Sequence, residues 1–357
     1  MACLYLYRDK LKHNYQFLEK TFKQHRIEWG VVTKLLCGNK KYLTEVLELN
    51  PRQACDSRLS NLKMIKEINP DIETIYIKPA AKNIIKSLVK YADVSLNTEF
   101  ETIKLISREA TRLKKIHKII IMIELGDLRE GILGDDLIAF YSKIFKLKGV
   151  EVIGIGTNLN CLHGVMPSQD KLLQLAMYKK IIELKFGKPL PFVSGGTTVT
   201  LPLLLKDKQF PKEVNHFRIG EALFFGADLF EDKTIKGMYP FTFELEAQVI
   251  EVSEKPSEPF GEFGENPSGD KYKPNPKKKN VRAHRAIIDV GLLDVNPKFL
   301  IPQNKKLKII GASSDMLVVD IGQSKHKYPV GSTMRFKLKY MGALSLLNSS
   351  YVDKEVL

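Results

Sequence analysis

The chain of 357 residues is 44% hydrophobic and carries a formal net charge of +15. That length exceeds one small domain, so we expect either two domains or one barrel-sized domain with an appendage. No uncharged apolar run approaches the ~18 residues of a membrane span, and the segment MACLYLYRDK lacks the features of a signal peptide. The four cysteines form no Cys-x-x-Cys pair. These features predict a cytoplasmic protein without a membrane segment, disulfide framework or metal site.

The basic charge is spread through the chain, apart from a run at Lys277–Lys279. No basic helix, RNA-binding motif or interleaved aromatic stripe accompanies it. We therefore interpret the charge as a solvated lysine-rich surface rather than a nucleic-acid interface. Nucleic-acid binding is the alternative, and the salt dependence of binding would reveal it.

An amphipathic helix is predicted at residues 8–25, where Leu11, Tyr15, Leu18 and Phe22 recur on one helical face. After it, apolar runs alternate with helical patterns. The predicted strands are residues 29–36, 52–55, 73–78, 92–96, 117–124, 151–156, 191–194 and 214–218. The predicted helices are residues 39–49, 58–68, 82–91, 98–114, 135–146, 169–185 and 199–206.

This alternation is typical of parallel strands joined by crossover helices, and eight such strands predict a (β/α)8 barrel. An open doubly wound sheet also alternates, but it usually has fewer strands and an early glycine-rich turn. The absence of Gly-x-Gly-x-x-Gly after the first strand disfavours a nicotinamide-binding sheet. Within the fourth of these helices, a capping-box pattern predicts that Thr98 and Glu101 close the first turn.

The pattern changes after Gly237. Residues 241–249 alternate strictly between apolar and polar, and the register shifts at Ile250 as at a β-bulge. Ser253–Asn280 is rich in Pro, Gly and charge, which predicts an exposed loop. Further strands are predicted at residues 283–290, 306–311, 315–321 and 334–340. We therefore predict a barrel over residues 1–237 and an all-β C-terminal domain over residues 238–357.

In such a barrel, reactive groups lie at the carboxyl ends of the strands. The stretch EWGVVTKLLCG places Lys34 in the first strand, where loss of hydration would favour the neutral, nucleophilic amine. A lysine on a solvated face is the ordinary alternative. Polar groups that follow later strands are Arg129, Asn158, Asn160, Ser194–Thr198 and Arg218–Glu221.

The Ser194–Thr198 turn precedes a helix, so its amides can bind an anion, and the Arg218–Glu221 segment offers more amides. Barrels commonly bind phosphate at their last two strand–helix loops. A phosphate site together with a strand-borne lysine indicates pyridoxal phosphate bound as a Schiff base. Each feature alone also fits an ordinary turn or helix cap.

The motifs VTK, ELGDLREG, IGTN, SGG, RIGEA and GASSD, in this order, resemble the alanine racemase fold group of pyridoxal phosphate enzymes. Within that group the chain is most similar to racemases of ornithine and other larger amino acids. The resemblance covers nearly the whole chain. It implies that Lys34 binds the cofactor and is the base on one face of the substrate. It also implies that Arg129 hydrogen-bonds the phenolate oxygen and that Arg218 faces the pyridine nitrogen.

The same resemblance implies a homodimer with shared active sites, in which Asp315 approaches the partner subunit's site. Asn158 would lie against the cofactor ring. The phosphate-binding residues that it implies are Ser194, Gly196, Thr197, Gly220, Glu221 and Tyr351.

Three positions depart from the alanine racemase pattern. Asn158 stands where those enzymes have a histidine, and Gly38 where they have a tyrosine. Their second base, a tyrosine, matches Phe263 or a neighbouring acid here. Racemisation exchanges protons on both faces of a planar carbanion, so another acid/base is required. The candidates are Cys161, His163, Tyr272, His284 and Asp315, and each also has an ordinary structural interpretation.

Among these candidates, Cys161 is the best placed, because it follows the same strand end as Asn158. His284 and Asp315 would act from the other subunit. The sequence thus predicts a pyridoxal-phosphate-dependent amino-acid racemase, an isomerase of D-amino-acid metabolism, acting on ornithine, lysine or another large amino acid. The alternatives are a decarboxylase or aldolase of the same fold, and a non-catalytic pyridoxal-phosphate-binding protein.

Overall fold

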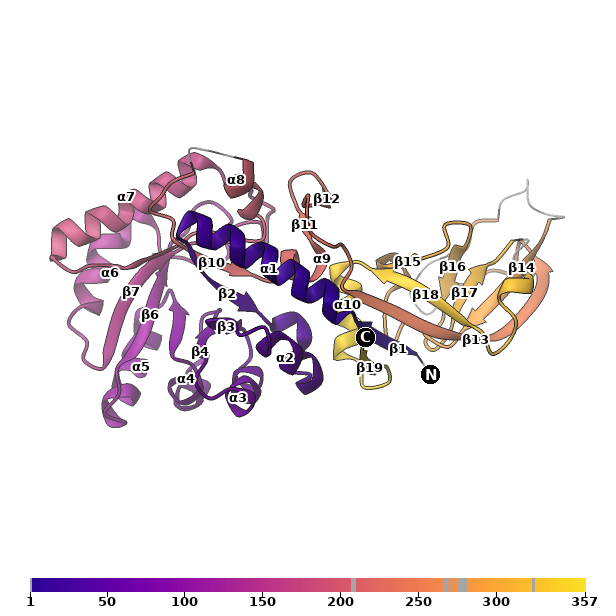
Figure 1. Cartoon of the computed structure of the whole chain (residues 1–357), viewed down its shortest axis with the longest axis horizontal. Coiled ribbons are helices and arrows are strands. Elements are labelled where there is room, and N and C mark those ends of the chain that lie inside the picture. The colour runs from indigo at the N-terminus through magenta and orange to yellow at the C-terminus, as the bar shows by residue number, and fades with distance from the viewer. Residues whose placement is uncertain (1, 207–209, 266–268, 270, 275–280, 323–324) are drawn as a thin grey trace. The chain divides into compact units, whose positions relative to one another are not determined.

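The structure, a computed structural model, describes residues 2–206, 210–265, 269, 271–274, 281–322 and 325–357. It divides into two compact units: a barrel unit, Tyr7–Thr242, and a sheet unit made of Met1–Leu6 with Phe243–Leu357 (Figure 1). This division differs from the one predicted at residues 237 and 238. The first strand, β1 (Cys3–Leu6), pairs with strands of the sheet unit and therefore belongs to it.

The barrel unit alternates strands and helices, except that β9 follows β8 and β12 follows β11 directly. Its strands are β2 (Glu28–Val32), β3 (Gln53–Asp56), β4 (Glu73–Tyr76), β5 (Val94–Asn97), β6 (His117–Met122), β7 (Val150–Gly156), β8 (Phe192–Ser194), β9 (Gly196–Thr197), β10 (His216–Ile219), β11 (Ala227–Asp228) and β12 (Lys233–Thr234). Its α-helices are α1 (Arg8–His25), α2 (Lys40–Leu47), α3 (Leu59–Ile68), α4 (Ile85–Tyr91), α5 (Phe100–Arg112), α6 (Leu137–Ile144), α7 (Gln169–Phe186), α8 (Leu201–Lys206) and α9 (Glu221–Phe225). Short 3-10 turns are η1 (Lys34–Leu36), η2 (Lys82–Ile84) and η3 (Gly134–Asp136).

The barrel sheet runs in the order β8-β7-β6-β5-β4-β3-β2-β10-β9, and its pairs are parallel. β8 pairs with β7 and β9 pairs with β10, so the two ends of the sheet are separated only by Gly195. This arrangement confirms the predicted (β/α)8 barrel, with one interrupted strand. The pairing of β9 with β10 requires a glycine at position 196, because a Cβ there would lie 2.1 Å from the Phe217 ring.

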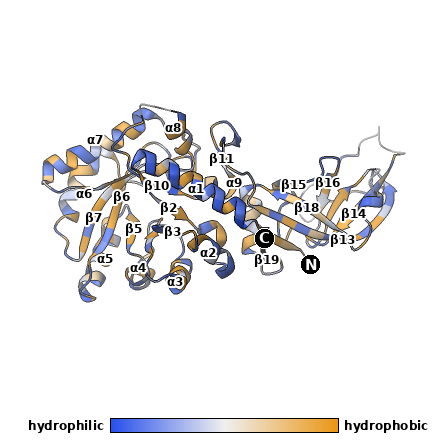
Figure 2. Cartoon of the chain, viewed as in Figure 1, coloured by the Kyte–Doolittle hydropathy of each residue, from blue (hydrophilic) through white to orange (hydrophobic). Residues whose placement is uncertain are grey.

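The barrel core is made of strand side chains. One buried cluster contains Val32, Cys55, Ile75, Val94, Leu96, Ile120, Met122 and Ile153. In Figure 2 the barrel strands are mostly hydrophobic, whereas the surrounding helices carry both kinds of side chain. Such continuous apolar runs suit strands that are covered on both faces.

Helix ends follow local chemistry. α7 ends at Phe186, before Gly187 as predicted; Gly187 has φ of 61°, and its amide donates to the Glu183 carbonyl at 2.9 Å. The prediction for α5 was wrong: the helix begins two residues later, and Glu99 is its cap. The Glu99 carboxylate accepts the Glu101 amide at 2.8 Å and the Thr102 amide at 2.7 Å. A longer carboxylate thus takes the place expected for Thr98.

The sheet unit is largely antiparallel. Its later strands are β13 (Phe243–Pro256), β14 (Arg282–Ile288), β15 (Leu300–Pro302), β16 (Lys308–Ala312), β17 (Leu317–Asp320), β18 (Thr333–Leu338) and β19 (Asp353–Val356). Their main order is β15-β18-β13-β14-β17-β16, and β1 lies between β13 and β19. The unit also contains 3-10 turns at Pro297–Phe299 and Lys325–Lys327 and the helix α10 (Tyr340–Asn348), none of which was predicted.

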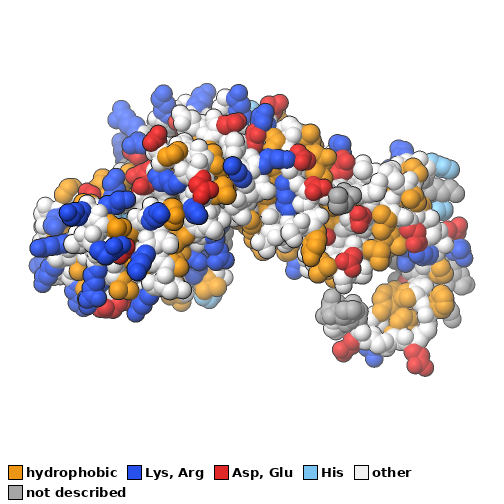
Figure 3. Space-filling view, turned by 90° about the horizontal axis from the view of Figure 1, so that it is seen from below, with side chains coloured by type: hydrophobic (Ala, Val, Ile, Leu, Met, Phe, Trp, Pro, Cys, Tyr) orange, Lys and Arg blue, Asp and Glu red, His pale blue; other side chains and the backbone are white. Residues whose placement is uncertain are grey.

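The predicted bulge is confirmed, because the pairing of β13 with β14 shifts between Val249 and Glu251. β13 continues to Pro256, so the loop begins after the predicted Ser253. The Lys277–Lys279 run lies outside the described residues. In the face that Figure 3 shows, Lys and Arg side chains of the barrel unit are scattered among apolar and uncharged ones. Among the described residues, no helix is long and apolar enough to cross a membrane.

Candidate active site

Lys34 lies just beyond the end of β2, at the carboxyl end of the barrel. The strand ends at Val32, and Lys34 begins η1 with an exposed side chain. The strand is therefore shorter than the predicted residues 29–36, and Lys34 has the exposed position that was the ordinary alternative. The preceding residue is rigidly held: the Thr33 hydroxyl donates to Asp56 at 2.8 Å, and its amide donates to the Cys55 carbonyl at 2.9 Å.

Asp56 is a buried carboxyl that sequence reasoning missed. Besides Thr33, it accepts the Arg58 amide at 2.9 Å and the Asn61 side chain at 3.1 Å. Burial raises the pKa of Asp56, and these hydrogen bonds oppose that rise. The turn after Lys34 ends at Gly38, where φ is +77° and a Cβ would lie 2.6 Å from Asn61 Oδ1. The departure from tyrosine at this position thus has a steric reason.

Arg218, on β10, is a buried cation held by neutral oxygens. Its Nη1 donates to the Ser194 carbonyl at 3.0 Å and to the Ser194 hydroxyl, and its Nη2 donates to the Thr157 carbonyl at 2.8 Å. Burial lowers the pKa of Arg218. Within the described part of the chain, no carboxylate lies within salt-bridge distance of it. These bonds use three of its five N–H groups.

Ser194, a predicted phosphate contact, forms hydrogen bonds inside the barrel. Its side chain is fully buried, and its hydroxyl contacts Arg218 and lies 2.7 Å from Nδ1 of His216. The reason is strand geometry, since β8 directs this side chain into the barrel. His216 is a further residue that sequence reasoning missed, although its position two residues before Arg218 places both on one face of β10.

Arg129 extends from a tight loop after β6. The loop returns to the strand, because the Ile132 amide donates to the Met122 carbonyl at 2.9 Å. Gly131 makes the return possible: at φ of +146°, a Cβ would lie 2.3 Å from a backbone nitrogen. Arg129 forms a bidentate ion pair with Glu130, which raises the pKa of the arginine.

The same loop meets the segment that follows β7. Asn158 Nδ2 lies 3.4 Å from a Glu130 carboxylate oxygen and 3.2 Å from Cys161 Sγ. The structure thus brings together Arg129, Asn158 and Cys161, and adds Glu130, which sequence reasoning did not select. The Cys161 thiol is exposed. Asn160 adopts φ of 57°, a left-handed conformation that asparagine tolerates in turns.

Asp127 organises the loop that carries Cys161. Its carboxylate accepts four backbone amides, from Cys161 at 3.0 Å, Leu162 at 2.9 Å, His163 at 3.2 Å and Val165 at 3.3 Å. Burial alone would raise the pKa of Asp127, but these bonds lower it. The His163 ring also lies 2.8 Å from the Asp127 carbonyl through Nδ1. His163 therefore has a structural partner in this loop.

The two predicted phosphate loops are joined. The Thr198 hydroxyl accepts the Ala222 amide at 3.2 Å, which links the loop after β9 to the start of α9. Glu221 is half-buried, and burial raises its pKa while the Lys34 charge opposes the shift. The carboxyl end of the barrel therefore holds Lys34, both predicted phosphate loops and the arginine of β10.

Three predicted residues belong to the sheet unit. Tyr351 is exposed between α10 and β19, Asp315 is exposed in the turn between β16 and β17, and His284 lies half-buried on β14. Within the described residues, no group of three or more His, Cys, Asp or Glu side chains is placed to hold a metal ion.

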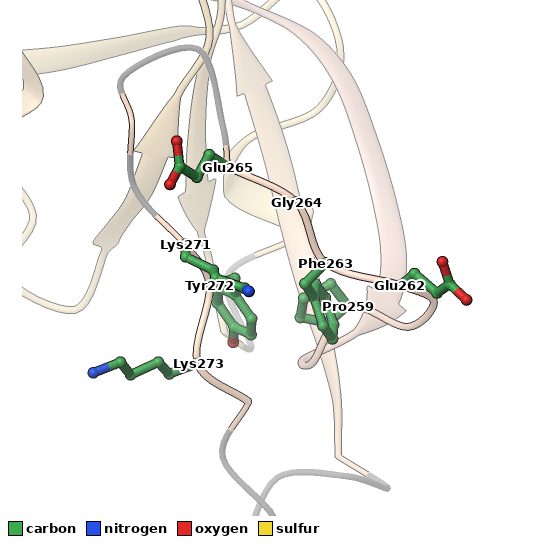
Figure 4. A pocket seen from close by; sticks show the side chains of 8 residues that line it. All are labelled: Pro259, Glu262, Phe263, Gly264, Glu265, Lys271, Tyr272 and Lys273. Atoms are coloured by element: carbon green, nitrogen blue, oxygen red, sulfur yellow. The ribbon is translucent and has the colours of Figure 1, made fainter.

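Phe263 lines a hollow of about 680 Å³ in the sheet unit. Its ring lies 5.6 Å from that of Tyr272, with the two ring planes tilted by 39° (Figure 4). The Tyr272 hydroxyl donates to Glu258 at 2.9 Å, and this bond raises the pKa of the tyrosine. The phenol nearest the Phe263 position thus already has a carboxylate partner.

The fold and the grouped side chains define a barrel enzyme whose lysine and arginine lie at the carboxyl ends of the strands. A family model described as the alanine racemase N-terminal domain matches residues 6–228. An ornithine racemase from Acetoanaerobium sticklandii is 35% identical, over 98% of this chain and 98% of its own. A lysine racemase from Thermotoga maritima is 30% identical, over 97% of this chain and 95% of its own.

The structure also matches an alanine racemase from Bartonella henselae with covalently bound pyridoxal phosphate. The TM-score is 0.74 at 15% identity, over 100% of this chain and 99% of that one, which shows a shared fold. The chain belongs to the alanine racemase family. It is an amino-acid racemase, and therefore an isomerase. Members of this family depend on pyridoxal phosphate.

Proposed function

We propose that this racemase interconverts the L and D forms of an amino acid with a long basic side chain, ornithine or lysine. Support comes from the ornithine and lysine racemases, whose identity to this chain extends over both units. We also propose that pyridoxal phosphate binds at the carboxyl end of the barrel. The observation that carries this is the exposed Lys34 amine at the same barrel end as a buried Arg218 guanidinium held by neutral oxygens.

The donors at this end suit the cofactor. An aldehyde group reacts with an amine such as that of Lys34. Arg218 has only donors, so it suits a pyridine nitrogen that stays unprotonated. Arg129 suits the phenolate oxygen, and Asn158 suits the face of the ring. The residues proposed for the phosphate are Gly196, Thr197, Gly220, Glu221 and Tyr351.

When bound, pyridoxal phosphate supplies an electron sink that makes the α-proton of an amino acid acidic. The chain must then move that proton on both faces of the α-carbon. We propose that Nζ of Lys34 does so on one face and Sγ of Cys161 on the other. Asn158 donates to that sulfur, and Asp127 holds the backbone that carries it.

We further propose a cytoplasmic homodimer of D-amino-acid metabolism. His284 and Asp315 would then serve the partner subunit's site. Mixing two inactive variants, Lys34→Ala and Asp315→Ala, is expected to restore part of the activity, because mixed dimers contain one complete site. A monomer by light scattering, or mixtures as inactive as each variant, would contradict the shared site.

The test of the whole proposal begins with α-proton exchange. The purified protein with pyridoxal phosphate is incubated in deuterated water with L-ornithine, L-lysine or L-alanine. Exchange and formation of the D form, measured by NMR and chiral chromatography, are expected to be fastest for ornithine or lysine. Carbon dioxide release without exchange would indicate a decarboxylase. Cofactor binding without turnover of any amino acid would indicate a binding protein.

A further inference from the structure

A chain of buried hydrogen bonds runs from Arg218 through the barrel interior. Ser194 Oγ lies 2.7 Å from Nδ1 of His216, and Nε2 of His216 lies 2.9 Å from Oε1 of Gln53. Nε2 of Gln53 then donates to Glu73 at 2.7 Å. Ser194, His216 and Gln53 are each at most 1% exposed. The chain thus connects β8, β10, β3 and β4.

A glycine lets this chain cross the intervening strand. β2 lies between β10 and β3, and Gly30 of β2 pairs with Arg218 on one side and with Gln53 on the other. A Cβ at Gly30 would lie 2.5 Å from Cys55 Sγ and 3.2 Å from the Cβ of Gln53. The missing side chain leaves room for Gln53 to reach across to His216.

The chemistry of the groups fixes the direction of every bond. A guanidinium only donates, so the Ser194 hydroxyl accepts from Arg218 and directs its single hydrogen to Nδ1 of His216. Nδ1 is then unprotonated, and Nε2–H donates to the Gln53 carbonyl oxygen. The amide group of Gln53 is left to donate to Glu73. Burial and the Arg218 charge lower the pKa of His216 to about 3, so the ring is neutral at physiological pH.

We propose that His216 is a positioning residue: Glu73 and Gln53 hold it in the Nε2–H tautomer, and through Ser194 it fixes the Arg218 guanidinium. The inference rests on the proposed function in one respect, namely that Arg218 faces the cofactor's pyridine nitrogen. A guanidinium whose planar group is held on its inner side presents its remaining donors in one direction only.

The barrel contains a matched control for this chain. His117 of β6 contacts Ser95 of β5 through Nε2 at 2.9 Å, and both side chains are buried. This pair has the same chemistry, but it bonds to Asn97 and not to an arginine. A purely structural role for buried Ser–His pairs predicts equal effects at both sites, whereas positioning of Arg218 predicts effects at His216 alone.

The test uses Gln53→Met, which removes the acceptor at similar volume, and the exchange variant Gln53→Glu with Glu73→Gln, which restores it. In the cofactor-free protein, ¹⁵N NMR is expected to show one His216 tautomer and slowly exchanging Arg218 N–H signals. Gln53→Met should lose both signatures, and the exchange variant should recover them. His117→Gln should leave them unchanged.

In the protein loaded with pyridoxal phosphate, Gln53→Met is expected to shift the visible absorbance band and to lower kcat roughly tenfold, with KM little changed. The reason is that the variant loses a hydrogen bond that helps to orient the charged Arg218 side chain. Equal shifts in Gln53→Met and His117→Gln, or Arg218 signals unaffected by Gln53→Met, would overturn the positioning role. Absence of any cofactor band in the wild-type protein would refute the proposed function separately, because the cofactor-free signals do not depend on it.

Discussion

Replacement of Asp127 by asparagine is expected to loosen the loop that carries Cys161. The carboxylate accepts two backbone amides on each oxygen. Asparagine keeps one acceptor oxygen, and its amide group faces two N–H donors that it cannot accept. Two hydrogen bonds to a charged group are therefore lost, at about 1.5 kcal/mol each, or about 3 kcal/mol together.

If the barrel unit unfolds cooperatively, that loss lowers its Tm by roughly 6–12 °C, because about 1 kcal/mol corresponds to about 2–4 °C at this size. The assay combines thermal unfolding with the rate at which a thiol reagent modifies Cys161, which should rise as the loop opens. The matched control is Asp135→Asn, an exposed carboxylate in the same connection between β6 and α6. Unchanged Tm and unchanged thiol reactivity in Asp127→Asn would refute the reasoning.

Further predictions concern pH, proton transfer and packing. Burial lowers the pKa of His117 to about 4 and of His216 to about 3. In the unfolded chain a histidine has a pKa of about 6.5, so below that pH the two rings bind more protons in the unfolded chain than in the folded one. The unfolding free energy is therefore highest above about pH 6.5, and each histidine lowers it by about 2 kcal/mol on going to pH 5. Urea titrations at several pH values can check this, and His117→Gln should reduce the dependence of the unfolding free energy on pH. Cys161→Ser should slow racemisation, with exchange of the α-proton surviving for one enantiomer; equal losses for both enantiomers would argue against its role on one face. Gly196→Ala should lower the yield of soluble protein, because its Cβ would lie 2.1 Å from the Phe217 ring, and wild-type stability would show that the closure at this strand can shift.

Periodicity was sufficient to predict the barrel, because parallel strands covered on both faces leave continuous apolar runs. It also located the bulge at Ile250, where two outward residues follow one another. It could not assign β1 to the sheet unit, since pairing between residues so distant in sequence leaves no local pattern. α10 was missed because its residues, YMGALSLLN, directly continue the predicted strand 334–340.

The sequence predicts the site residues that lie at the ends of strands, but not those that loops bring into contact by folding back. Lys34, Arg218 and Asn158 follow from the barrel rule alone. Asp127 and Glu130 act through contacts with loops that lie about thirty residues further along the chain, as in the bond from Asn158 to Glu130. The predicted strand 29–36 was too long because the apolar run continues past the end of β2 into a 3-10 turn.

The placement of β1 has a consequence for synthesis. The barrel unit is an insertion between the two pieces of the sheet unit, so all of it leaves the ribosome before β13 exists. β1, made before the barrel unit, finds one neighbour in β13 and the other only in β19, once Asp353–Val356 have been made. Until then one edge of β1 stays open to pairing with other chains. Ribosome-bound chains that stop before Asp353 should therefore associate more readily than full-length ones.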